Sequence, residues 1–269
     1  MSSITRPVRH AVVALLCALA GAAPLAAHAG DDDTIATDRP DFVESSNVVG
    51  KSRFQLETSI GMDRNKAGSV RERSWSTPTL LRFGISDNVE LRLETDGAMR
   101  QRVSDSTTGV RLSERGYGDV SLGLKWHVLD AAGNLPSVGV LFHADMETGS
   151  PPFRGEGTRP SARMVAEWEL GNDLSLGVMP GMGYERHAGG TFGILGVVLG
   201  KAWNDQLRSF VELSSPRIDS NVDGGTEASA TVGVAYLISN NCQIDSALSR
   251  GLKHRTPDLS VTVGLSFKL

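Results

Sequence analysis

The sequence predicts an all-β protein, an antiparallel transmembrane β-barrel of about 12 strands. Three observations indicate this fold class. Apolar and polar residues alternate along many segments, the polar links at one end of these segments are longer than the turns at the other, and aromatic residues gather near the segment ends. Alternation with a period of two is typical of a strand with one apolar face, and about 9–11 tilted residues cross a bilayer.

Residues 1–29 have the features of a secretory signal peptide. Arg6 and Arg9 precede the apolar run 11–20, and Ala27-His28-Ala29 is a cleavage site of the small-x-small type. A membrane anchor is the alternative, but the apolar run is too short to span a bilayer. We therefore expect an exported chain that is cleaved after Ala29.

Composition limits the class of partner. The first 29 residues hold two of the 27 basic residues and no acidic one, so the rest carries 25 basic against 31 acidic residues, a formal net charge of −6. The sequence shows no basic patch, so neither a nucleic-acid partner nor attraction to a membrane through a polybasic face is expected. Beyond residue 29 the single cysteine is Cys242, so no internal disulfide is expected.

Strand-period alternation recurs through the body of the chain. The last segment shows it best, because apolar Leu265, Phe267 and Leu269 alternate with polar residues. Twelve segments are predicted as strands: 51–62, 72–85, 88–99, 117–129, 136–147, 161–170, 173–185, 191–203, 206–214, 226–238, 241–250 and 258–269. Lipid contacts are expected from the apolar side chains Leu122, Leu124, Val140, Phe142, Val261 and Val263.

The links between these segments indicate a membrane barrel. Longer polar links are expected at 63–71, 100–116, 148–160, 215–225 and 251–257, with a shorter one at 186–190. The other end has tight turns at 86–87, 171–172, 204–205 and 240, and a medium link at 130–135. Long loops at one end and short turns at the other are typical of bacterial outer-membrane barrels, and an even strand count places both termini in the periplasm.

Residues 30–50 precede the predicted barrel of residues 51–269. Our interpretation is a periplasmic N-terminal segment. The alternative is a plug that uses Asp38, Arg39 and Asp41 against charges in the lumen. Both interpretations fit a polar stretch without strand alternation.

Aromatic residues support the membrane assignment. Trp126, Trp168 and Trp203, three of the four tryptophans, lie near the predicted periplasmic ends of strands. Amphipathic rings favour the level of the lipid headgroups. A soluble β-sandwich is the alternative, and it would not place these rings at one rim.

Several blocks resemble one known family, the MetA-pathway of phenol degradation family. The blocks are Thr37-Asp38-Arg39-Pro40-Asp41-Phe42, Phe54-Gln55-Leu56-Glu57-Thr58, Thr77-Pro78-x-x-Leu81-Arg82-Phe83-Gly84, Gly118-Asp119-x-x-x-Gly123-x-Lys125-Trp126, Leu248-Ser249-Arg250-Gly251-Leu252 and Thr256-Pro257-Asp258. The resemblance implies an outer-membrane barrel associated with uptake of aromatic or other hydrophobic compounds. The ending Thr262-x-Gly264-x-x-Phe267-x-Leu269 also looks like the signal that the barrel-assembly machinery reads.

Charged side chains of both signs fall on the predicted inward face. They are Arg82, Glu90, Arg92, Glu94, Lys125, His127, His143, Asp145, Glu147, Arg163, Glu167, Glu169, Arg208, Glu212 and Asp245. Facing lipid, a charge near the bilayer midplane would cost about 2–4 kcal/mol. Facing inward, these residues form either a salt-bridge network that fills a narrow barrel or a charged constriction that selects solutes.

These observations predict a passive channel for small hydrophobic or aromatic solutes, with outer-membrane lipid as its surroundings. A structural or adhesive barrel with a closed lumen is the first alternative. A barrel that hydrolyses lipid is the second, although no nucleophile-elbow motif is present. No cofactor or metal is expected, because His127 and His143 lack further ligands at suitable spacing. Gly193, Gly196 and Gly200 predict a wall opening through which an apolar solute could leave sideways.

Overall fold

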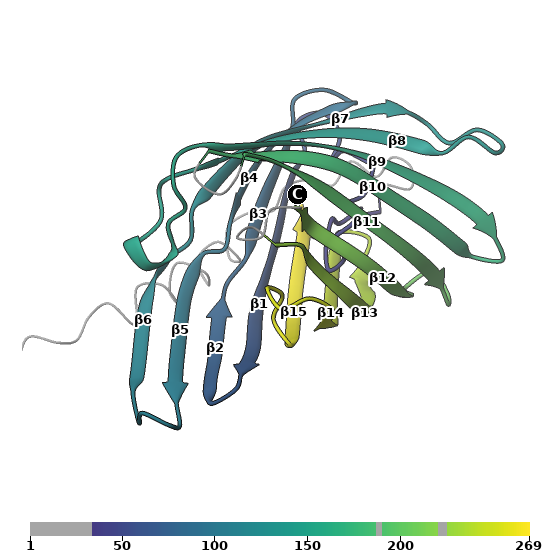
Figure 1. The fold of residues 1–269 in the computed structure, drawn as a ribbon. Helices are drawn as coiled ribbons and strands as arrows, with labels where there is room; N and C mark the ends of the chain where they lie inside the picture. Colours follow the sequence, from purple (N-terminus) through teal and green to yellow (C-terminus); the bar gives the residue numbers. More distant parts are fainter. Residues whose placement is uncertain (1–33, 187–189, 220–224) are drawn as a thin grey trace, which may run out of the picture. The chain divides into compact units, whose positions relative to one another are not determined.

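The computed structural model describes residues 34–186, 190–219 and 225–269. The predicted signal peptide and its cleavage site at Ala29 lie outside the described residues. Within those ranges, no helix has the length and apolar character needed to cross a membrane. The chain forms one antiparallel sheet that closes on itself through pairing of its first and last strands (Figure 1).

The strands follow one another around the barrel. They are β1 (Phe54–Ala67), β2 (Val70–Ser76), β3 (Thr79–Gly84), β4 (Val89–Thr95), β5 (Ala98–Asp105), β6 (Arg111–Tyr117), β7 (Val120–Leu129), β8 (Ser137–Met146), β9 (Arg159–Gly171), β10 (Leu174–Glu185), β11 (Gly190–Ala202), β12 (Leu207–Ile218), β13 (Glu227–Ser239), β14 (Cys242–Gly251) and β15 (Leu259–Lys268). A short 3-10 helix, η1 (Pro151–Phe153), lies in the link after β8.

Three of the strands are interrupted. Both β2 and β3 pair with β1. On their other sides, β2 pairs with β5 and β3 pairs with β4. In the same way, β5 then pairs with β6 and β4 pairs with β7. The consecutive segments β2 and β3, β4 and β5, and β6 and β7 therefore each form one long strand, broken at 77–78, 96–97 and 118–119 in that order. The 15 segments make 12 crossing strands, which confirms the predicted fold class and strand number.

Two of the predicted loops are strands. Most of 63–71 belongs to β1 and β2, and most of 100–116 belongs to β5 and β6. These strands extend beyond the rest of the barrel (Figure 1), and we call β2, β5, β6 and residues 62–67 of β1 the extension. Both faces of the extension meet water or headgroups, so its strands lack the apolar alternation on which the prediction depended.

The barrel is polar inside and apolar outside. Gln55, Glu57 and Arg82 are fully buried, whereas the side chains expected to contact lipid point outward, with Phe142 50% exposed and Val263 51% exposed. A polar interior and an apolar outer band are the normal arrangement of an outer-membrane barrel. The alternation in the sequence therefore has the expected register.

Candidate functional site

The barrel interior contains a segment of its own chain. Residues 35–49, which we call the inner segment, enter beside the turn after β13, where the Ile35 amide donates to the Asn240 carbonyl at 2.7 Å. Further along, the Ser46 amide donates to Glu167 at 2.6 Å and the Val49 amide donates to Glu90 at 2.8 Å. Because carboxylates of the barrel wall accept these backbone amides, residues 35–49 lie inside the barrel and not in the expected periplasmic position.

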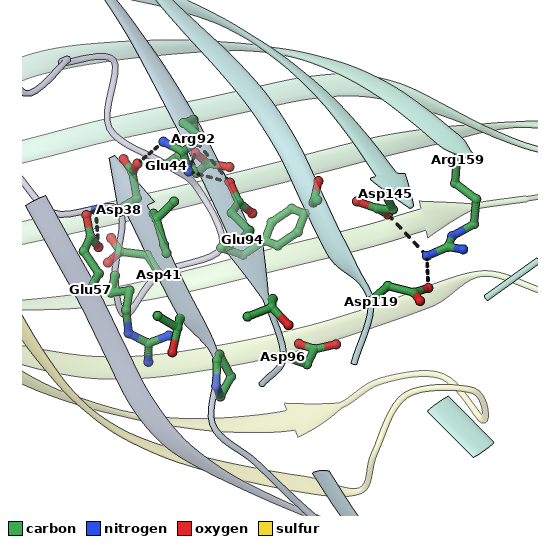
Figure 2. Close-up of a pocket in the computed structure, with 17 residues that line it drawn as sticks. Asp38, Asp41, Glu44, Glu57, Arg92, Glu94, Asp96, Asp119, Asp145 and Arg159 are labelled. Carbon is green, nitrogen blue, oxygen red and sulfur yellow. Dashed lines mark hydrogen bonds and ion pairs between the residues drawn. The ribbon is translucent and has the colours of Figure 1, made fainter. Parts of the chain in front are cut away.

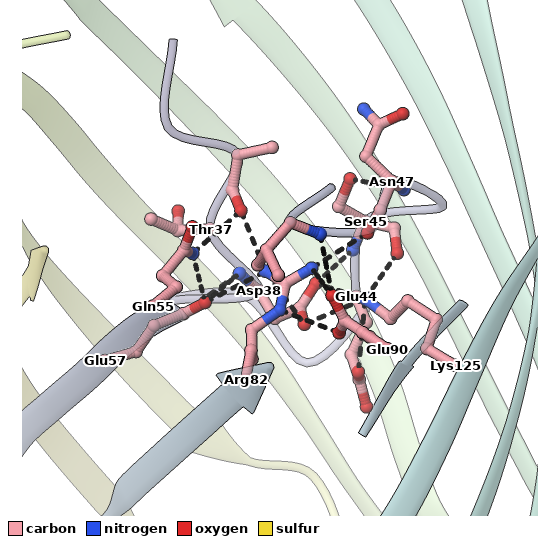
Figure 3. Close-up of polar contacts among 12 residues, drawn as sticks. Thr37, Asp38, Glu44, Ser45, Asn47, Gln55, Glu57, Arg82, Glu90 and Lys125 are labelled. Carbon is pink, nitrogen blue, oxygen red and sulfur yellow. Dashed lines mark hydrogen bonds and ion pairs between the residues drawn. The ribbon is translucent and has the colours of Figure 1, made fainter. Parts of the chain in front are cut away.

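Asp38 is the main attachment of the inner segment to the charged part of the wall (Figure 3). Its carboxylate accepts from Lys125 Nζ at 2.7 Å and also from Arg92. Its own amide donates to Glu57 at 3.0 Å. Burial raises the pKa of Asp38, but the charges of Arg82, Lys125 and Arg92 lower it by more, so the pKa lies well below its usual range.

Arg82 ties the wall to the backbone of the inner segment. Its guanidinium donates to Glu90 at 2.8 Å and to Glu57 at 3.0 Å. It also donates to the carbonyls of Ala36 and Asn47, both at 2.8 Å. A planar guanidinium has five donors in a fixed fork, so one buried Arg82 can hold two strands and both ends of the segment together.

The remaining attachments differ in length around the barrel. Glu44 forms ion pairs with Arg92 at 2.8 Å and with Arg163 at 2.9 Å. On the wall of β12 and β14, the Arg208 to Asp41 pair is 3.3 Å and the Arg39 to Asp245 pair is 3.8 Å. Ion pairs and hydrogen bonds weaken as these distances grow. The ion pairs of the inner segment are therefore longer on the β12 and β14 wall, where hydrogen bonds of 2.8 Å to Glu212 and from Gln243 also hold the segment.

An apolar patch on the inner wall begins beside the charged cluster, where Leu141 is paired with Lys125. It consists of the buried side chains Leu141, Val165, Met179, Val198, Phe210 and Ala247, and Val43 of the inner segment packs against it with Phe42 beside it. Glu212 accepts the amides of Phe42 and Val43, both at 2.8 Å, and so fixes this turn. The lumen consequently has an apolar patch among charged side chains, because Arg163, Arg208 and Glu212 come from the same strands as the patch.

Two cavities lie in the lumen on either side of the inner segment. One has a volume of about 330 Å³ and is lined by charged residues that include Glu57, Glu94 and Asp145 (Figure 2). The other has about 630 Å³ and includes residues of the short turns, such as Asn204 and Gln206. Asp41 lines both cavities. The inner segment thus separates an outer vestibule from a periplasmic one.

The outer mouth is ordered by Asp119, which stands at the break between β6 and β7. Its carboxylate accepts from the amides of Gly149 at 2.7 Å and Gly155 at 2.9 Å, and it pairs with Arg159 at 2.8 Å. Burial raises the pKa of Asp119, and these hydrogen bonds and Arg159 lower it by more, giving a net lowering. The link with η1 is therefore tied to the barrel rim.

The structure brings most of the predicted lumen residues together around the inner segment. Arg82, Glu90, Arg92, Lys125, His127, Arg163, Glu167, Arg208, Glu212 and Asp245 bond or pair with it. Glu94 accepts a hydrogen bond from His143 Nε2 at 2.9 Å and pairs with Arg92. Three lie apart: Asp145 at the outer vestibule, Glu147 in the exposed link after β8, and Glu169 at the periplasmic vestibule.

Several site residues were not among the predicted ones. Gln55 and Glu57 face inward between Phe54, Leu56 and Thr58, and this alternation was available in the sequence. Asp119 and Arg159 meet only because two strand ends come together at the rim. The role of Glu44 depends on the position of the inner segment, which strand periodicity does not give.

The glycine-rich strand does not form the expected wall opening. Gly193, Gly196 and Gly200 are paired with β10 on one side and with β12 on the other. A Cβ atom at Gly196 would lie 2.6 Å from a methyl carbon of Val43. The missing side chain therefore lets the inner segment approach the wall.

The fold is similar to solved outer-membrane channels. The COG4313 outer membrane channel from Pseudomonas putida F1 superposes with a TM-score of 0.61 at 12% identity, covering 86% of this chain and 99% of that one. The KdgM porin superposes with a TM-score of 0.52 at 9% identity, covering 79% and 98%. No curated protein matches the sequence.

The family comparison covers the inner segment as well as the barrel. The profile of the family described as "Putative MetA-pathway of phenol degradation" matches residues 37–269. The match begins at Thr37, within the inner segment, and continues to the end of β15. The protein is thus a bacterial outer-membrane β-barrel, and it belongs to this family.

Proposed function

We propose that this protein is a passive channel for small solutes that carry an aromatic or other apolar part. The observation that carries the proposal is an apolar patch inside a charged lumen, which Phe42 and Val43 of the inner segment cover. A solute such as a phenol likewise has an apolar part and a polar group. Its ring would lie against Met179 and Phe210, while its hydroxyl would meet the charged side chains.

The route would follow the side of the inner segment on which the ion pairs are longer, beside β12 and β14. The pairs at 3.3 and 3.8 Å between this segment and the β12 and β14 wall leave the anchors on Asp38 untouched if they separate. Asp41 already lines both vestibules. A displacement of the Phe42–Val43 turn, which also requires its two amides to leave Glu212, would connect the vestibules while Asp38 stays attached.

Single-channel recording and whole-cell uptake test the proposal together. Phe42→Ala removes the ring from the apolar patch and keeps the backbone bonds to Glu212. We expect larger single-channel conductance in planar bilayers and faster uptake of a radiolabelled aromatic tracer by cells. Leu248→Ala, on the lipid-facing side, is the matched control and should change neither.

A closed structural barrel is the alternative, favoured by the dense ion-pair network around Arg82 and Asp38. It predicts no conductance in the original protein or in Phe42→Ala, and uptake equal to that of a strain lacking the protein. Either result would exclude the channel.

We propose further that the protein is not an enzyme. The support is the family and the channel folds that it resembles. Vesicles that contain the folded barrel should release no fatty acid from their lipid. Insertion by the barrel-assembly machinery is supported by the amphipathic final strand β15, and the acidic mature chain supports the absence of a nucleic-acid partner.

A further inference from the structure

The outer face of the extension is strongly basic, so the expectation of a chain without a basic patch was wrong, because strand pairing gathers residues that are spread along the sequence. Its basic side chains, which we call the basic face, are Arg64, Lys66, Arg71, Arg73, Arg100, Arg102, Arg111 and Arg115. They share one face because directly paired residues point the same way, as in the rows Arg64, Arg73 and Arg102 or Trp75, Arg100 and Arg115. The face continues the lipid-facing side of β1, on which Ile60 is 66% exposed.

The acidic residues of the extension lie on the opposite face. Asp63, Glu72, Asp105 and Glu114 alternate with the basic positions and point to the barrel side. Between the two faces, the sheet itself keeps the charges apart. Among the described residues, no side chain of the basic face forms an ion pair, and Arg100 Nε is buried without a hydrogen-bond partner. The positive charge of this face is therefore not neutralised within the chain.

The basic face begins where the lipid-facing wall ends. Trp75 stands in its first row, and Arg102 lies over the Trp75 ring at 5.5 Å. Tryptophan favours the boundary between hydrocarbon and headgroups. The three basic rows are two residues apart along the strands, so they span roughly 13 Å beyond this boundary. The first rows therefore lie at the level of the outer-leaflet headgroups, a layer about 5–8 Å deep, and the last row lies beyond it.

We infer that the basic face binds the phosphate groups of lipids in the outer leaflet that surrounds the barrel. Neighbouring strands place guanidinium groups side by side, an arrangement that can hold one phosphate between two forked donors. The acyl chains of such a lipid would run down the apolar wall below Trp75. A soluble acidic protein or a nucleic acid has no acyl chains, so it would make no use of the apolar wall that adjoins the basic face.

Lipid binding by the purified, folded barrel in a zwitterionic detergent tests this inference. The probe is diphosphorylated lipid A, with dephosphorylated lipid A and inorganic phosphate as separate arms, and native mass spectrometry counts the bound lipid. The test variant is Arg73→Gln/Arg102→Gln/Arg115→Gln. The matched control, Arg154→Gln/Arg186→Gln/Lys253→Gln, removes three exposed cations from other loops.

The diphosphorylated lipid should bind the original protein and the control equally well. At low salt, loss of three basic residues should weaken its binding about a hundredfold. Because the substituted side chains are exposed and outside the core, heat-dependent migration on gels should show that both variants are folded. Equal binding by the test variant, equal binding of dephosphorylated lipid, or binding of inorganic phosphate as strong as that of the lipid would each overturn the inference. The outcome is independent of transport.

Discussion

Asp38 shows how single residues hold a charged segment inside a membrane barrel. Its carboxylate meets Lys125 and Arg92, and Arg82 lies 3.4 Å away. A buried charge is tolerated when it is paired and hydrogen-bonded. The lowered pKa of Asp38 means that its stabilising charge is present above its ordinary value of 3.8 and is lost only as the pH falls through the still lower pKa of the folded state.

The substitution Asp38→Asn should release the inner segment. It removes the partner of buried Lys125 and Arg92, a type of change that costs about 3–5 kcal/mol. We expect a lower thermal unfolding temperature and faster protease cleavage within residues 35–49. Asp130→Asn, whose carboxylate is 96% exposed, is the control and should change neither. An unchanged cleavage rate in Asp38→Asn would show that the attachment does not depend on this carboxylate.

The strand breaks at 77–78, 96–97 and 118–119 divide the barrel wall from the extension. They lie next to one another, and Gly97 at the centre has a φ of +64°, where a Cβ would lie 2.3 Å from the Thr77 carbonyl oxygen. Pro78 follows Thr77 directly, and it has no backbone N–H that could donate a hydrogen bond to a neighbouring strand. The outward residues change at these breaks from leucines below to arginines above. The breaks thus mark the level at which the wall leaves the hydrocarbon.

The height of a strand residue should decide the cost of a charge. Phe142, in the middle of β8, and Val110, in the turn between β5 and β6, are both 50% exposed. Phe142→Arg should lower the free energy of unfolding from liposomes in urea by about 2–4 kcal/mol, because arginine enters the bilayer core. Val110→Arg should change it by less than about 0.5 kcal/mol. Equal effects of the two substitutions would place Phe142 outside the hydrocarbon.

At the scale of the whole molecule, the barrel closes beside the point at which the inner segment enters. The first and last strands pair over Gln55–Arg64, and the Phe54 carbonyl accepts from the Leu269 amide at 2.8 Å. The Ile35 amide is bound at the turn after β13. Both ends of the described chain therefore meet the periplasmic rim, beside the seam at which β1 and β15 close the wall.

The predicted cleavage after Ala29 would leave residues 30–34 ahead of Ile35, the first attachment of the inner segment. Export should remove residues 1–29, so that N-terminal sequencing of the envelope protein begins at Gly30. Ala29→Arg should block processing, because the cleavage site requires small residues. A mature protein that begins beyond Ile35 would contradict the prediction, since the inner segment would then lack its first attachment.

The fold class followed from the sequence because lipid imposes a strict rule on every crossing strand. Alternate residues such as Leu122 and Phe142 must be apolar, while their neighbours Ser121, Lys125 and His143 can face an interior of a different polarity. A period of two, repeated 12 times, therefore determined the barrel, its register and the inward position of most charged side chains. The tertiary structure alone decided what those charges bind. Residues 35–49 have no periodic pattern, and their position depends on carboxylates and guanidinium groups from strands far apart in the chain, as in Glu212 with Phe42. The extension was likewise hidden, since strands outside the bilayer need no apolar face.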